Sequence, residues 1–186
     1  MTFAAWNSAI EAIYAAAAAP TLWPDTLSQV AQLLDADGGI LLYRNDNGSM
    51  SVIVSPNLVE MAKDYADNWQ HLDVRAERGF EDLSTGQRDV VTDRRYFSDE
   101  EVATLPIFQE FLLPHGYLWA IGASVSPTPS ASVMLTFLRA KHKPAYDDAD
   151  EVQMLALSRH VERALSLSVR LLDAEAERLG LSEALD

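Results

Sequence analysis

The sequence predicts an α+β fold in which helices flank an antiparallel sheet and a long helix ends the chain. Strand-like segments occur in two adjacent pairs, and a short turn-forming segment joins each pair, which is typical of antiparallel hairpins. Segments with apolar residues at helical spacing precede, separate and follow these pairs. Because the strands are too few for a repeated strand–helix–strand pattern, a parallel sheet is not expected. With 186 residues and no internal linker or repeat, the chain is expected to form one domain over 1–186.

Two helices and a hairpin are predicted at the start of the chain. Apolar residues recur at helical spacing over 3–14, and Pro20 ends the first helix. Pro24 suits the first turn of a second helix, which ends at Gly38. Two strand-like runs follow, and Asn47-Gly48 between them is a strong signal for a hairpin turn.

A charged aromatic segment lies in the middle of the chain. A helix is predicted from about Leu58 to Trp69, and a short strand is predicted at 88–91. Between them, residues 68–80 (NWQHLDVRAERGF) combine two aromatic residues, a histidine, two carboxylates and two arginines. We interpret this segment as the connection that leaves the helix and leads to the short strand.

The second half of the chain is predicted to hold a helix, a second hairpin and the long final helix. Ser98 followed by Glu101 forms a capping box, and Pro106 kinks or splits the helix that begins there. The segments YLWAIGASVS and ASVMLTFLRA are the strands of the second hairpin. A helix over about 147–180 follows, and the carboxylates in its first turn suit its dipole.

The charge and composition of the chain exclude several classes of function. Asp and Glu number 28 against 14 Lys and Arg, which gives a formal charge of −14. Such a surface repels phosphate backbones and anionic lipids, so this chain alone is not expected to bind nucleic acid or a membrane. The absence of cysteine excludes disulfides, thiol catalysis and thiolate metal sites. The N-terminal residues fit an amphipathic helix better than a signal peptide, and no apolar run is long enough to span a membrane, so a cytoplasmic location is expected.

No familiar catalytic, metal-binding or DNA-reading motif stands out. A helix-turn-helix would need its recognition helix over 38–43, which reads as a strand. The four histidines stand far apart, and the glycines form no phosphate-binding loop, so neither a metal nor a cofactor is expected. Carboxylates at 77, 81 and 82 leave acid–base chemistry open, but such residues usually form a solvated face, and an enzyme is not expected.

The final helix carries two adjacent apolar stripes. One stripe suffices to pack on the sheet, so the second is predicted to meet a partner helix in a homodimer. The residues predicted to carry dimerisation are Val161, Leu165, Leu172 and Leu179. A wider face within the same chain is the alternative.

Several stretches together resemble a known family. AIYAAAAAPTLWPDTLSQVAQLLDADGGILLY resembles the opening of the GAF-like sensor domain at the N-terminus of many LuxR-type bacterial transcription regulators. YADNWQHLDVRAERG resembles a later segment of these domains, with Val74 where proline is usual. FQEFLLPHGYLWAIGASV and the final helix resemble their C-terminal part, so the likeness covers nearly the whole chain.

The resemblance implies a GAF/PAS-like sensory module that binds a small molecule between the sheet and its covering helices. DNA would be contacted only through a helix-turn-helix domain, which these 186 residues do not contain. Such a pocket has apolar walls and a few polar groups that orient the ligand. The residues predicted to form it are Tyr43, Trp69, Phe80 and Trp119 as walls and Asp73, Arg75 and His115 as orienting groups.

Other interpretations of these residues stay open. Asp73 and Arg75 suit a second role in which they cap a helix and pair with each other, while the tryptophans belong to the core. The whole chain then serves as a structural dimerisation module without a ligand. An enzyme of unrecognised type is a third interpretation.

Overall fold

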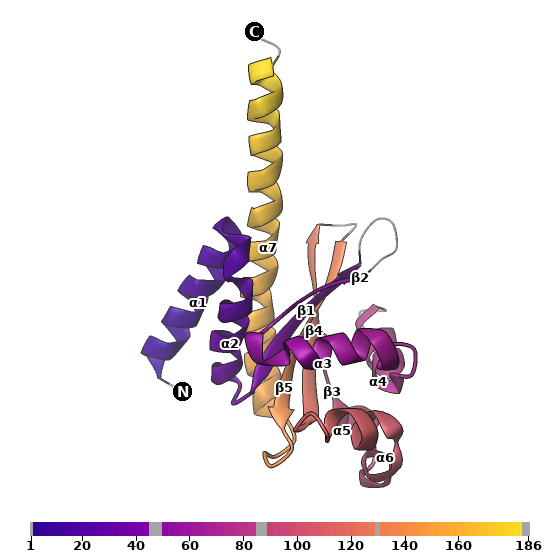
Figure 1. The fold of residues 1–186 in the computed structure, drawn as a ribbon. Helices are drawn as coiled ribbons and strands as arrows, with labels where there is room; N and C mark the ends of the chain where they lie inside the picture. The colour runs from indigo at the N-terminus through magenta and orange to yellow at the C-terminus, as the bar shows by residue number, and fades with distance from the viewer. Residues whose placement is uncertain (1, 45–49, 85–88, 129–130, 184–186) are drawn as a thin grey trace.

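The fold is built on one antiparallel sheet with the strand order β2-β1-β5-β4-β3 (Figure 1). The computed structural model describes the main chain over 2–44, 50–84, 89–128 and 131–183, and the side chains at 44, 50, 80–84, 173 and 175–183 lie outside the description. The strands are β1 (Gly38–Arg44), β2 (Met50–Val54), β3 (Val90–Thr92), β4 (Tyr117–Thr128) and β5 (Ala131–Ala140).

Two hairpins form most of this sheet. β1 pairs with β2, β4 pairs with β5, and the hairpins join through β1 and β5, where Leu41 lies opposite Leu135. The short strand β3 adds to the edge formed by β4. The predicted α+β fold with an antiparallel sheet is confirmed, whereas the predicted Asn47-Gly48 turn lies outside the described residues.

One face of the sheet is covered by the two N-terminal helices and the final helix. These are α1 (Phe3–Ala18), α2 (Trp23–Leu33), which follows the short turn η1 (Pro20–Leu22), and α7 (Asp148–Glu183). Their apolar side chains form one core with the sheet, and Ile13, Leu135 and Leu157 in it have no exposed surface. The burial of such side chains supplies the main driving force for docking these helices.

The opposite face is covered by a series of short helices. They are η2 (Pro56–Leu58), α3 (Val59–Asp64), η3 (Tyr65–Trp69), α4 (Val74–Ser84), α5 (Asp93–Tyr96), α6 (Asp99–Thr104) and η4 (Ile107–Leu112). Together with the sheet they enclose a second core, in which Leu58, Phe108 and Leu112 are fully buried. The sheet therefore separates two cores.

The short helices differ in part from the sequence-based expectation. Residues 74–84 form helix α4, where we expected only a connection, and α5 follows directly after β3. The capping box of Ser98 and Glu101 is confirmed at the start of α6. That helix ends before Pro106, and a separate helical segment begins at Ile107, so the predicted kink is a complete break.

Helix α7 is buried on one side along its first half and projects beyond the rest of the chain along its second (Figure 1). Met154, Val161 and Ala164 pack against the sheet and are almost fully buried. Further along, Leu171 and Leu172 are 47% and 67% exposed. Each of the two predicted apolar stripes is therefore buried in the first half of the helix and exposed in the second half. The helix does not bury one stripe and expose the other.

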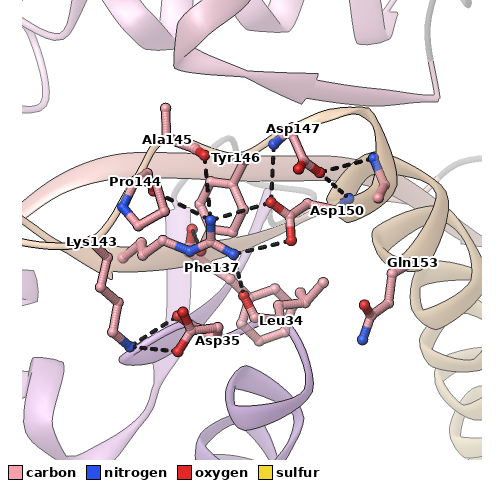
Figure 2. Close-up of polar contacts among 12 residues, drawn as sticks. Leu34, Asp35, Phe137, Lys143, Pro144, Ala145, Tyr146, Asp147, Asp150 and Gln153 are labelled. Atoms are coloured by element: carbon pink, nitrogen blue, oxygen red, sulfur yellow. Dashed lines mark hydrogen bonds and ion pairs between the residues drawn. The ribbon is translucent and has the colours of Figure 1, made fainter. Parts of the chain in front are cut away.

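A buried arginine, Arg139, links the start of α7 to β5 and to the end of α2, and Figure 2 labels its partners Leu34, Tyr146 and Asp150. Arg139, at the end of β5, is 3% exposed and donates to the Leu34 carbonyl at 2.6 Å and to Asp150 at 3.0 Å. Its guanidinium lies 3.8 Å from the ring centre of Tyr146. Gln153, in the first turns of α7, donates to the Leu33 carbonyl. These contacts tie α2, β5 and α7 together at one point, which we call the Arg139 joint.

Candidate functional site

Two π-helical segments lie on the face covered by short helices. Helix α3 continues into the π-helical segment η3, and η4 is the second such segment. Tyr65 and Trp69 of η3 pack on Phe111 of η4, with ring centres 5.7 Å and 5.5 Å apart. The wider helical turn is rare in proteins and is frequent at functional sites. This pair of segments therefore makes the face a candidate functional site.

A cluster of charged side chains lies beside these aromatic rings. It comprises Asp73 and Arg75 at the start of α4 and Asp93 at the start of α5, and we call it the Asp–Arg–Asp cluster. The side chains of Asp73, Arg75 and Asp93 are 5%, 14% and 7% exposed. Charged groups are almost never buried to this degree unless they are paired, because the loss of hydration is costly.

Asp73 is the most heavily bonded member of the cluster. Its Oδ1 accepts hydrogen bonds from the main-chain N–H groups of Arg75 and Ala76, which caps helix α4. Arg75 also donates from Nε to Oδ1 at 3.2 Å and from Nη2 to Oδ2 at 3.1 Å, and the Tyr65 hydroxyl donates to Oδ2. Burial acts to raise the pKa of Asp73, but the charge and hydrogen bonds of Arg75 outweigh it and lower the pKa.

The side chain of Asp93 accepts fewer hydrogen bonds than that of Asp73. From the described residues it accepts one hydrogen bond, from the main-chain N–H of Ala120 to Oδ2 at 2.7 Å, and Nη1 of Arg75 lies 3.8 Å from the same oxygen. Burial raises the pKa of Asp93 to about 6, against the opposing effects of Arg75 and the Ala120 amide. Perturbed carboxyl groups of this kind cluster at functional sites.

His115 lies at the rim of the same face. Its ring centre is 5.2 Å from that of Phe111, and its Nε2 is 2.8 Å from Oδ2 of Asp64. The hydrogen bond from His115 is the largest of the effects that lower the pKa of Asp64. This contact joins the end of η4 to the end of α3, so His115 helps to hold the two covering segments together.

The structure brings some of the predicted pocket residues together and separates others. Four of them lie on one face of the sheet, namely Trp69, Asp73, Arg75 and His115. Trp119 packs against both cores. The prediction that Tyr43 is a wall of the same pocket is corrected. Side chains alternate between the two faces of a strand, and Tyr43 points to the opposite face, toward the core of α1, α2 and α7. The side chain of Phe80 lies outside the described residues.

Three important residues were not anticipated from the sequence. Tyr65 and Phe111 pack around Trp69, and Asp93 completes the charged cluster. The spacing of Tyr65 and Trp69 along one helix is a signal that could have identified Tyr65. Asp93 carries no comparable signal, because only the pairing of β3 with β4 brings it to Ala120.

The residues predicted to carry dimerisation occupy different environments. Val161 is 1% exposed and packs within the chain's own core, so it offers no surface to a partner. Leu165 is partly buried against the same core, whereas Leu172 is 67% exposed. The side chain of Leu179 lies outside the described residues.

The Asp–Arg–Asp cluster is surrounded by closely packed side chains. Phe108 and Phe111 beneath it are at most 1% exposed, and the Arg75 guanidinium lies 6.0 Å from the ring centre of Phe108. Surface hollows of about 530 Å³ and 340 Å³ lie between α1 and α2 and between α5 and the start of α7, and the second is lined by Thr92 and Arg94, which flank Asp93 in the sequence. A ligand at the cluster would therefore have to displace side chains.

Two further features follow from the part of the chain that the structure describes. Within those residues, no group of three or more histidine, aspartate or glutamate side chains is placed to hold a metal ion. Over the same residues, no helix combines the length and the apolar character that crossing a membrane requires.

The chain matches no protein-family model and no curated protein, but its fold matches solved structures. One is the N-acylhomoserine lactone dependent LuxR family transcription factor CepR2 from Burkholderia cenocepacia, with a TM-score of 0.60, 13% identity, and coverage of 88% of this chain and 96% of that one. The VqsR ligand-binding domain from Pseudomonas aeruginosa gives a TM-score of 0.57 at 14% identity, with coverage of 89% and 97%.

Two other matches extend this likeness. SdiA in complex with octanoyl-rac-glycerol gives a TM-score of 0.56 at 19% identity and covers 87% of this chain, which spans only 60% of that SdiA chain. The third GAF domain of Slr1393 from Synechocystis gives a TM-score of 0.51 at 16% identity, with coverage of 91% and 97%. The predicted likeness to GAF-like domains of LuxR-type regulators is therefore confirmed at the level of the fold.

Proposed function

We propose that the chain is a ligand-sensing regulatory domain of a LuxR-type transcriptional regulator that works in the cytoplasm. The observation that carries this proposal is the Asp–Arg–Asp cluster, buried between the sheet and a cover of two π-helical segments. Buried, incompletely paired charges cost stability and are typical of functional sites. Support also comes from the fold it shares with CepR2, the VqsR ligand-binding domain and SdiA with octanoyl-rac-glycerol.

In this proposal the ligand lies between the sheet and η3, α4 and η4. Trp69 and Phe111 provide apolar contacts, and the charged cluster orients the polar end of the ligand. Because side chains fill this region, binding has to separate the covering helices from the sheet. Such a movement is a means of passing the signal to other parts of the regulator, and DNA would be contacted through a domain outside these residues.

Native mass spectrometry of the protein purified from cells tests the proposal. We expect an extra mass that is absent from the denatured sample and absent from a Trp69→Ala variant. Trp6→Ala is the matched control, because Trp6 is also partly buried but packs on the opposite core. If neither an extra mass nor binding of added octanoyl-rac-glycerol is found, the chain is better described as a structural module.

Dimerisation through the projecting half of α7 is the second part of the proposal. Leu167, Leu171 and Leu172 are 41%, 47% and 67% exposed, and apolar side chains at this spacing suit a helix–helix contact between two copies. A Leu171→Glu/Leu172→Glu variant is expected to be monomeric at micromolar concentration in sedimentation velocity. Val152→Glu, which replaces a 72% exposed residue near the start of α7, is expected to leave the dimer intact. A dimer that survives the double substitution would disprove this role of α7.

A further inference from the structure

Within the proposed site, Asp73 has no capacity left for a ligand. A carboxylate offers about four lone-pair positions. Asp73 already accepts from two main-chain N–H groups, two guanidinium N–H groups and the Tyr65 hydroxyl. A ligand could reach Asp73 only by breaking the Arg75 pair that stabilises the start of α4.

Asp93 has the opposite character. The N–H of Ala120 donates to its Oδ2, while the 3.8 Å separation from Arg75 is too long for a hydrogen bond. No hydrogen bond to its Oδ1 is found among the described residues. The side chain is nevertheless only 7% exposed. Asp93 is therefore an almost buried carboxylate that receives one hydrogen bond from the described residues, and its Oδ1 is not among their fully buried unpaired atoms, so it keeps access to a further donor.

The charge balance of the cluster separates the possible kinds of ligand. Two carboxylates and one guanidinium leave one unbalanced negative charge, which Asp93 carries when it is ionised. An anionic ligand would have to pair with Arg75, whose Nε and Nη2 are already occupied by Asp73. A cationic group that donates hydrogen bonds would satisfy Asp93 and neutralise the buried charge.

From these contacts we infer that the ligand carries a positively charged, hydrogen-bond-donating head group, such as an ammonium or amidinium, that pairs with Asp93. The apolar remainder of the ligand lies against the aromatic side chains of the same face, including Trp69 and Phe111. This inference rests on the proposed function and adds the chemical class of the ligand.

The titration of Asp93 adds an independent consequence. Among the described residues, the charged groups that act on Asp93 are Arg75 and Asp73, and burial raises the pKa of Asp93 to about 6. Asp93 is thus mostly ionised at neutral pH and mostly protonated at about pH 5. A cationic ligand is expected to bind more weakly at about pH 5 because its partner has lost its charge.

The test compares probes that share one apolar tail and differ in the head group. Octylammonium, octanol and octanoate are titrated into the full chain by isothermal calorimetry at about pH 7.5 and about 0.15 M salt, which screens the general attraction of an acidic protein for cations. Asp93→Asn removes the acceptor charge while keeping the shape of the side chain. Asp99→Asn is the control, because it removes a carboxylate that is 83% exposed and pairs with Arg94.

Octylammonium is expected to bind about tenfold or more tightly than octanol and octanoate, which corresponds to one charge-assisted hydrogen bond. Asp93→Asn should abolish this preference, Asp99→Asn should retain it, and the wild-type preference should fall at about pH 5. Because the net charge of the whole chain also falls toward zero at about pH 5, the pH series does not isolate Asp93, and Asp93→Ser makes the same comparison if Asp93→Asn does not fold.

Other outcomes overturn the inference in distinguishable ways. If octanol or octanoate binds as tightly as octylammonium, the head-group assignment is wrong while the proposed binding site stands. A preference that persists in Asp93→Asn shows attraction to the acidic surface and also overturns the assignment. If none of these probes binds and octanoyl-rac-glycerol does not bind either, both the inference and the proposed function fail.

Discussion

At the scale of single residues, the stability of the fold is expected to depend on the protonation of Asp93. The carboxyl keeps its proton up to about pH 6 in the folded chain but only up to about its usual pKa of 3.8 when unfolded. Between these values the folded state binds more protons, so stability falls as the pH rises, and the full penalty remains above about pH 6. The difference in pKa corresponds to about 3 kcal/mol.

Asp93→Asn should remove this dependence. The variant is expected to be more stable than the wild type at about pH 7.5 and to lose that advantage at about pH 4. Thermal unfolding followed by circular dichroism at both pH values measures the difference. Asp99→Asn, an exposed control, should follow the wild type. Parallel pH profiles of Asp93→Asn and wild type would contradict the raised pKa.

The Arg139 joint gives a second prediction for single residues. Arg139→Met removes the partner of Asp150 and of the Leu34 carbonyl and is expected to lower the free energy of unfolding by about 3 kcal/mol or more. Arg95→Met breaks the pair with Glu151 at the surface and is expected to cost less than about 1 kcal/mol. Urea unfolding of both variants distinguishes these values, and equal losses would show that burial of Arg139 is not decisive.

Some members of the charged cluster could be predicted from sequence and others could not. Asp73 and Arg75 are close along the chain, so their pairing and the capping by Asp73 were among the alternatives that the sequence left open. Asp93 belongs to the cluster only because β3 pairs antiparallel with β4 and places Ala120 opposite it. A long-range register of this kind has no local signature.

At the scale of secondary-structure elements, the start of α6 depends on its capping box. The Ser98 hydroxyl accepts from the Glu101 N–H, and the Glu101 carboxylate accepts from the Ser98 N–H. Ser98→Ala is expected to destabilise the chain by about 1 kcal/mol. Thr104→Ala, at the other end of the helix, removes only an exposed hydroxyl contact and is expected to be nearly neutral. Equal unfolding midpoints in urea for the two variants would contradict the importance of the cap.

The elements that were predicted correctly are those with a strong local period or a clear terminal signal. The hairpin strands and α7 belong to this group, since each has an extended apolar pattern. Helix α4 was missed because its segment is rich in charged residues and contains Gly79, so its helical character depends on the Asp73 cap and on packing against β3. The π-helical segments also depend on tertiary packing.

At the scale of the whole molecule, the net charge of −14 predicts a response to salt. Repulsion among the excess carboxylates opposes the compact state, and added salt screens that repulsion. The melting temperature is therefore expected to rise between about 20 mM and about 500 mM sodium chloride. Potassium chloride at equal ionic strength serves as a control for specific sodium effects. A fall in melting temperature would indicate that surface pairs such as Arg95 with Glu151 outweigh the repulsion.

The arrangement of α7 has a mechanical consequence. Its 36 residues correspond to a rigid rod of about 54 Å at the usual rise of an α-helix. The Arg139 joint holds this rod near one end, while the other end projects past the sheet. The part of α7 beyond the buried Ala164 is about 28 Å long, so a bend of about 10° where the core ends would carry the far tip through roughly 5 Å. A bend that leaves the buried half of α7 in place would thus become, at the tip, a movement of about half the spacing between packed helices.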